Sequence, residues 1–131
     1  MADFIYSTYI DTMRKILVTA CILLLLDFLY IHFVFSHFRL QIHTVQKSPL
    51  KLNWLGAVGS YVLLIFGVYY FIIRTRRSVL DAFLLGSTIY GVYAMTTLAL
   101  LRDWWIATAV TDTLWGGILY ATTTYLAYKL I

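Results

Sequence analysis

The stretch Ile22-Leu23-Leu24-Leu25-Leu26-Asp27-Phe28-Leu29-Tyr30 decides the fold, because it places an acid inside a run of apolar residues that can cross a bilayer. The run covers about residues 16–35 and begins after the basic pair Arg14-Lys15. A helix needs about 20 apolar residues to span the hydrocarbon of a membrane. The run is nearly continuous and lacks the alternation of a half-buried strand. It therefore predicts a transmembrane helix.

Three further apolar runs follow, at about residues 54–73, 79–101 and 105–128. The second ends at the basic segment 74–77, and the third ends at Arg102-Asp103. We therefore expect an all-α membrane protein, in which residues 1–131 form a single domain of four transmembrane helices. The last three helices are joined by short connections and should pack antiparallel to one another. Residues 36–53 contain the only proline, Pro49, and are expected to form a longer interfacial connection that is either strand-like or helical.

Composition agrees with a membrane environment. The chain has 131 residues, of which 62% are hydrophobic and 12% charged, whereas soluble domains carry about 25% charged residues. The net charge of +4 comes from basic residues near the ends of the apolar runs, which favours contact with the lipid bilayer over nucleic acid. The distribution of Lys and Arg favours a multi-pass protein with both termini in the cytoplasm.

Two acids lie deep within the predicted spans, Asp27 in the first and Asp112 in the fourth. An ionisable group at that depth costs about 2.5–3.5 kcal/mol to insert, so it usually faces protein and has a function. At 1.5 Å per residue, both acids should lie in the half of the membrane away from the termini. Hydroxyl and aromatic residues on the third and fourth spans fall near the same layer by helical spacing. The predicted ligand- or ion-binding site comprises Asp27, Asp112, Tyr90, Tyr93, Thr97 and Trp115.

No basic residue is expected at the depth of these acids, which favours binding or movement of a proton, small cation or small polar ligand. Two adjoining acids in a low dielectric should not both ionise. One alternative is a structural or accessory subunit of a membrane or viral envelope assembly, with each Asp hydrogen-bonded to a neighbouring helix. Another is a lipid-modifying enzyme with one acid as general base.

The sequence identifies no catalytic residue, cofactor or metal site. His32, His37 and His43 are spaced by five and six residues, so no two consecutive ones share a helical face, and no glutamate accompanies them. Cys21 is the only cysteine. Steps of small residues, at Gly56 and Ser60, at Ser87 and Gly91 and at Gly116-Gly117, predict helix contacts. We expect a homo-oligomer or a larger membrane assembly.

Several motifs resemble an uncharacterised membrane family of bacteria and large viruses, domain of unknown function 2177. They are Leu26–Tyr30, the segment 90–99 that starts Tyr-Gly-Val-Tyr, Trp104, and Asp112-Thr-Leu-Trp-Gly-Gly117. The chain departs from the family pattern at Ala94, where an Asp is expected, and at Thr97, where an Asn is expected. The resemblance implies a membrane fold. It also implies that Asp27 and Asp112 are the acids of the family pattern that this chain keeps. It implies no activity beyond an association with lipid handling.

Overall fold

The computed structural model describes residues 1–46, 53–101 and 103–131, with side chains described in these ranges except for residues 35–46. Its elements are α1 (Ala2–Gln46), α2 (Trp54–Val68), the π-helical turn η1 (Tyr69–Ile73), α3 (Val79–Leu100) and α4 (Ile106–Leu130). No strand occurs among the described residues. The predicted all-α fold of four helices is confirmed.

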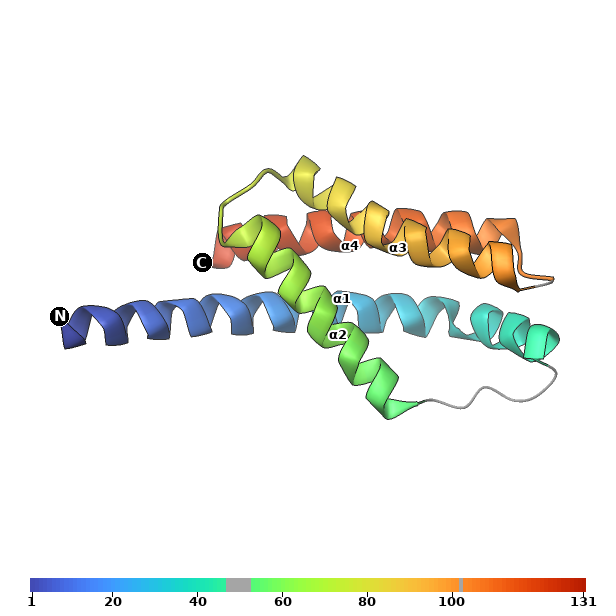
Figure 1. Ribbon diagram of the computed structural model, residues 1–131, viewed down its shortest axis with the longest axis horizontal. Helices are drawn as coiled ribbons and strands as arrows, with labels where there is room; N and C mark the ends of the chain where they lie inside the picture. Colours follow the sequence, from blue (N-terminus) through green and yellow to red (C-terminus); the bar gives the residue numbers. More distant parts are fainter. Residues whose placement is uncertain (47–52, 102) are drawn as a thin grey trace.

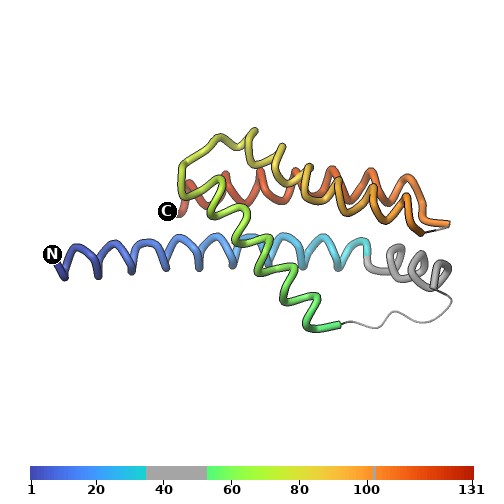
Figure 2. Tube along the Cα trace, in the orientation of Figure 1, coloured from blue at the N-terminus to red at the C-terminus, as the bar shows by residue number. Residues whose placement is uncertain are grey.

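Helix α1 is much longer than predicted. It runs for 45 residues, which corresponds to about 67 Å, and its amino-terminal end projects beyond the carboxyl end of α4 (Figures 1 and 2). Of the two conformations left open for the connection from residue 36, the structure has the helical one as far as residue 46, where it continues α1. Residues 36–46 contain no Gly or Pro to stop the helix. Pro49 lies outside the described residues.

Capping residues explain where α2 and α3 begin. The side chain of Asn53 accepts hydrogen bonds from the backbone N–H groups of Leu55 and Gly56, at 3.1 and 3.3 Å. The Ser78 hydroxyl accepts one from the N–H of Asp81 at 3.0 Å. Such side chains satisfy N–H groups that have no partner within the helix. Both starts agree with the predicted spans, and α2 with η1 covers Trp54–Ile73 as expected.

Three segments of the described chain are long and apolar enough to cross a membrane: Ala2–Val34, Trp54–Ile73 and Val79–Leu100. Helix α4 is long enough at 25 residues but is less apolar, because it carries Asp112 and several threonines. Many of its side chains are buried in the protein, including those of Thr108, Thr123 and Thr124. Helix α4 therefore directs polar side chains at its neighbours, and its crossing of the membrane stays a prediction.

Helices α3 and α4 lie side by side and antiparallel, and they form the most extensive helix contact (Figure 1). Glycines allow this approach: a Cβ added to Gly86 would lie 2.1 Å from the carbonyl oxygen of Gly116. The small residues predicted at 116–117 therefore do lie against another helix. Gly56 differs, because a Cβ there would meet nothing within 4 Å. Both residues of the predicted step, Gly56 and Ser60, are exposed.

Helix α4 also joins the bundle to α1 and α2. Leu23 of α1, Val68 of α2 and Leu119 of α4 are fully buried in one hydrophobic cluster. Tyr120 is buried beside them and donates a hydrogen bond from its hydroxyl to the Leu64 carbonyl at 2.7 Å. Helix α2 crosses α1 obliquely, so much of α2 is exposed on its outer face (Figure 1). This core positions one face of α1 against α4, and the two acids of the predicted site, Asp27 and Asp112, lie on these helices.

Candidate functional site

Asp27 is the most buried acid among the described residues, with 6% of its surface exposed. Its Oδ1 accepts a hydrogen bond from Nε1 of Trp115 at 3.0 Å, and its Oδ2 accepts one from the Tyr61 hydroxyl at 2.5 Å. These donors come from α4 and α2, so the carboxylate of α1 joins three helices. Two donors offset part of the free energy lost when a carboxylate leaves water.

Asp112 lies in a more open position. It is half-buried, and its Oδ1 accepts a hydrogen bond from the Tyr30 hydroxyl of α1 at 3.2 Å. The ring of Tyr30 stacks on the ring of Trp115, with centroids 4.3 Å apart and planes 5° from parallel. The stacked rings therefore connect the two acids, because Tyr30 donates to Asp112 and Trp115 donates to Asp27.

The two helices contribute the same short pattern in a reciprocal way. Helix α1 carries Asp27 and, three residues later, Tyr30, while α4 carries Asp112 and, three residues later, Trp115. Residues three apart lie on one helical face. Because α1 and α4 run antiparallel, each aromatic side chain reaches the acid of the opposite helix. The site is thus a crossed pair of acid–aromatic contacts that sets the register of the two helices.

A cavity of about 340 Å³ opens beside Asp112. This is close to the smaller end of the range for ligand pockets, about 300–1,000 Å³. Its walls are mainly apolar, and its polar groups come from Asp112, two threonines and the Tyr30 hydroxyl. The lining residues are Tyr30, Phe33, Val34, Ala107, Thr108, Thr111 and Asp112. Asp27 does not line this cavity, so the two acids occupy different surroundings.

Among the described residues, no basic side chain forms an ion pair with either acid. The ion pairs among the described residues are Lys15–Asp11 and Arg77–Asp81, both within one helix or at its end. No group of three His, Cys, Asp or Glu side chains in the described part of the chain could hold a metal ion. The side chains of His37 and His43 lie outside that part. The charge at the site therefore comes from the two carboxyl groups, and its donors come from aromatic side chains.

The structure brings together only part of the predicted site. Trp115 contacts Asp27 directly, and Tyr90 packs its ring over Gly116, next to Trp115. Tyr93 is 70% exposed and points away from α4, because the face of α3 toward α4 continues through the buried Ala94. The Thr97 hydroxyl donates to the Tyr93 carbonyl at 2.9 Å, and Thr97 does not line the cavity.

Two residues that hydrogen-bond the acids were missed from the sequence. Tyr30 could have been found, because it lies one helical turn after Asp27 on the same face. Tyr61 could not, because its place beside Asp27 depends on how α2 crosses α1. For Tyr61 the sequence shows just a hydroxyl group within an apolar span.

A family model described as "Predicted membrane protein (DUF2177)" matches residues 12–129, which include all the residues of the site. The chain belongs to this family. Membership in DUF2177 agrees with the resemblance drawn from the Asp27 and Asp112 motifs and shows a membrane protein. No curated protein and no solved structure matches the chain.

Proposed function

We propose that this membrane protein binds a small cationic or hydrogen-bond-donating ligand at Asp112, with the proton as the simplest case. The observation that carries the proposal is the cavity of about 340 Å³ that opens beside this half-buried carboxyl group. No described basic side chain pairs with Asp112, and a carboxylate in an apolar cavity attracts a positive charge or a proton. The threonines of the cavity wall, Thr108 and Thr111, add polar side chains near the same ligand.

Asp27 has a different part in this proposal. Both of its oxygens already accept hydrogen bonds, from Tyr61 and Trp115, and it is almost fully buried. Its part is to hold α1, α2 and α4 together and to orient Trp115, which in turn stacks on the Tyr30 that contacts Asp112. Asp27 is therefore a positioning residue for the ligand site.

Binding is better supported than transfer of a proton between the two acids. Among the described residues, Asp27 is connected to Asp112 through the stacked rings of Trp115 and Tyr30. Stacked rings exchange no protons, so these contacts form no continuous chain of proton donors and acceptors.

A structural or accessory role is the second candidate, and the saturated hydrogen bonding of Asp27 favours it. In that case Asp112 would serve only to accept the Tyr30 hydroxyl and fix the register of α1 against α4. The two candidates differ in whether Asp112 responds to the solution around the membrane.

Infrared difference spectroscopy of the reconstituted full chain tests this choice. The perfusing buffer is changed in pH, or from sodium to methylammonium as a small cationic probe. We expect a carboxyl band that responds, disappears in Asp112→Asn and persists in Asp27→Asn. No response in the wild-type protein, or an unchanged band in Asp112→Asn, would support the structural role and contradict ligand binding at Asp112.

A further inference from the structure

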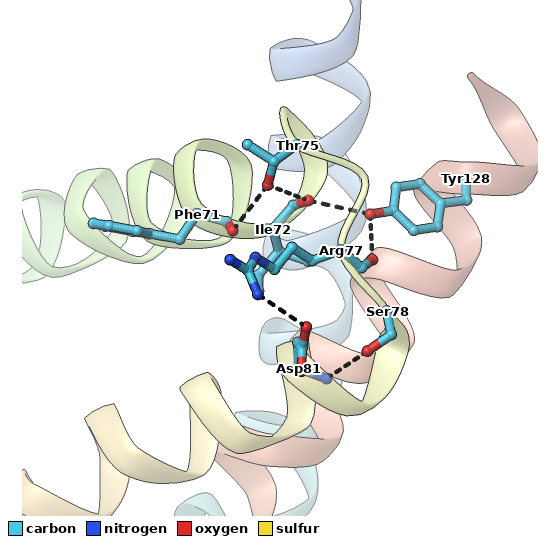
Figure 3. A network of polar contacts seen from close by, with 7 residues as sticks. All are labelled: Phe71, Ile72, Thr75, Arg77, Ser78, Asp81 and Tyr128. Carbon is cyan, nitrogen blue, oxygen red and sulfur yellow. Dashed lines mark hydrogen bonds and ion pairs between the residues drawn. The ribbon is translucent and has the colours of Figure 1, made fainter.

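The turn between η1 and α3, residues 74–78, is held in place by the end of α4. The Tyr128 hydroxyl lies close to two backbone carbonyl oxygens, of Ile72 at 3.2 Å and of Arg77 at 2.6 Å (Figure 3). Arg76 adopts the left-handed backbone region, with a φ of 52°. This segment carries three arginines, and the contacts give their backbone one defined conformation.

Three cationic side chains at this end of the molecule each lie over a tyrosine ring. Arg74 lies 4.2 Å from the ring centroid of Tyr70, and Arg76 lies 4.7 Å from that of Tyr128. Lys129 lies 4.8 Å from the ring centroid of Tyr125. Such contacts restrain a long side chain while its charged group stays accessible. The three basic residues are exposed. Arg74 and Arg76 belong to the turn between η1 and α3, and Lys129 belongs to the end of α4.

The arginines of the turn differ in how their charge is balanced. Arg77 pairs with Asp81 at 3.5 Å (Figure 3). Among the described residues, neither Arg74 nor Arg76 forms an ion pair. The Nε of Arg74 donates to the Tyr70 carbonyl at 3.4 Å, which leaves its terminal nitrogens for another acceptor. Two positioned guanidinium groups therefore remain without an anion.

An apolar aromatic surface adjoins Arg74 on α2 and η1. Phe66, Tyr70 and Phe71 are 52, 42 and 53% exposed. Their rings contact one another, with Phe66 and Tyr70 stacked at 5.2 Å and Tyr70 and Phe71 edge to face at 5.1 Å. Phe66 and Tyr70 lie within the apolar segment Trp54–Ile73, which ends one residue before Arg74. The basic side chain of Arg74 thus lies next to an exposed aromatic surface, as the charged headgroup of a lipid lies next to its acyl chain.

We propose that Arg74 and Arg76 bind the phosphate of an anionic phospholipid, whose acyl chain lies along Phe66, Tyr70 and Phe71. A guanidinium group matches two phosphate oxygens, and it is less strongly hydrated than an ammonium group. Lys129, which follows Tyr128 in α4, adds a further positive charge at this end of the molecule. This lipid site lies at the opposite end of α4 from the cavity at Asp112, so it does not depend on the proposed ligand.

The test compares lipid selectivity in nanodiscs of phosphatidylcholine that contain a minor fraction of spin-labelled phosphatidylglycerol. For the wild-type chain we expect phosphatidylglycerol to associate more strongly than spin-labelled phosphatidylcholine. Arg74→Gln and Arg76→Gln should each lower the relative association constant by about five-fold, since a basic residue near a membrane surface contributes about that factor. The double variant should lose most of the preference.

Arg77→Gln is the matched control, because Arg77 lies in the same turn but is already paired with Asp81. It should change lipid preference much less than either other substitution. If the double variant fails to purify, the two single variants test the same expectation. Equal losses from all three arginines would show nonspecific attraction and overturn the site, as would an unchanged preference in the Gln variants. Displacement of the labelled lipid by inorganic phosphate would overturn the lipid assignment.

Discussion

At the scale of single residues, the two acids differ because of what surrounds them. Asp27 has donors on both oxygens and almost no exposed surface, whereas Asp112 has one described side-chain donor and borders a cavity. The same residue type therefore stabilises the helix assembly at one position and faces a potential ligand at the other. Trp115 belongs to both environments, because it donates to Asp27 and stacks on Tyr30.

Trp115→Phe tests the hydrogen bond separately from the ring contact. Phenylalanine keeps an aromatic ring against Tyr30 but leaves Oδ1 of Asp27 without its indole donor. A buried acceptor without a partner costs about 1–3 kcal/mol, so the free energy of unfolding should fall by that amount. Unfolding in mixed detergent micelles measures it. Trp54→Phe is the control, since Trp54 is 72% exposed; equal losses in both variants would contradict the role of the indole N–H.

At the scale of helices, the contact between α3 and α4 depends on glycine. Gly86→Ala would place a methyl group 2.1 Å from a backbone oxygen of Gly116, and a backbone atom cannot move aside as a side chain can. The helices must separate, and we expect a loss of about 1–3 kcal/mol or more in unfolding free energy. Thermal unfolding in detergent measures the effect.

Gly59→Ala is the matched control, because a Cβ at Gly59 meets nothing within 4 Å. Alanine has a higher helix propensity than glycine by up to about 1 kcal/mol, so this variant should be neutral or slightly stabilised. A loss at position 59 similar to that at position 86 would mean that the packing of α3 on α4 does not explain the effect.

A second contact at this scale joins α4 to the turn of residues 74–78. Tyr128→Phe removes the hydroxyl beside the Ile72 and Arg77 carbonyls but keeps the ring beneath Arg76. We expect faster amide hydrogen exchange in residues 74–78 and a loss of about 1 kcal/mol in stability. Tyr125→Phe should leave exchange in this turn unchanged. Unchanged exchange in Tyr128→Phe would show that the turn is held by other contacts.

At the scale of the whole molecule, the antiparallel pairing of α3 and α4 returns the chain to the end where α3 began (Figure 1). In a Cys21→Ser background, Ser78→Cys and Leu130→Cys should react with an impermeant maleimide from one side of the membrane. Leu101→Cys should react from the other side. Labelling of Leu130→Cys together with Leu101→Cys from one side would mean that α4 does not cross the bilayer.

The sequence by itself determined the membrane class, the helical fold, the limits of the second and third spans and the positions of both acids. Local signals carry this information: apolar runs of about 20 residues, basic residues at their ends, and acids within apolar stretches. It did not predict that α1 continues to Gln46, because the residues after Phe35 mix polar with apolar side chains and resemble a connection.

Only the tertiary structure decided which residues surround each acid. The crossing of α2 over α1 brings Tyr61 to Asp27, and the register of α1 against α4 pairs Tyr30 with Asp112. Tyr93 shares the spacing of the site but is exposed, because close packing at Gly86 and Gly116 turns Ala94 toward α4 instead. Periodicity defines the faces of a helix, whereas the partner of each face depends on packing between segments far apart in the chain.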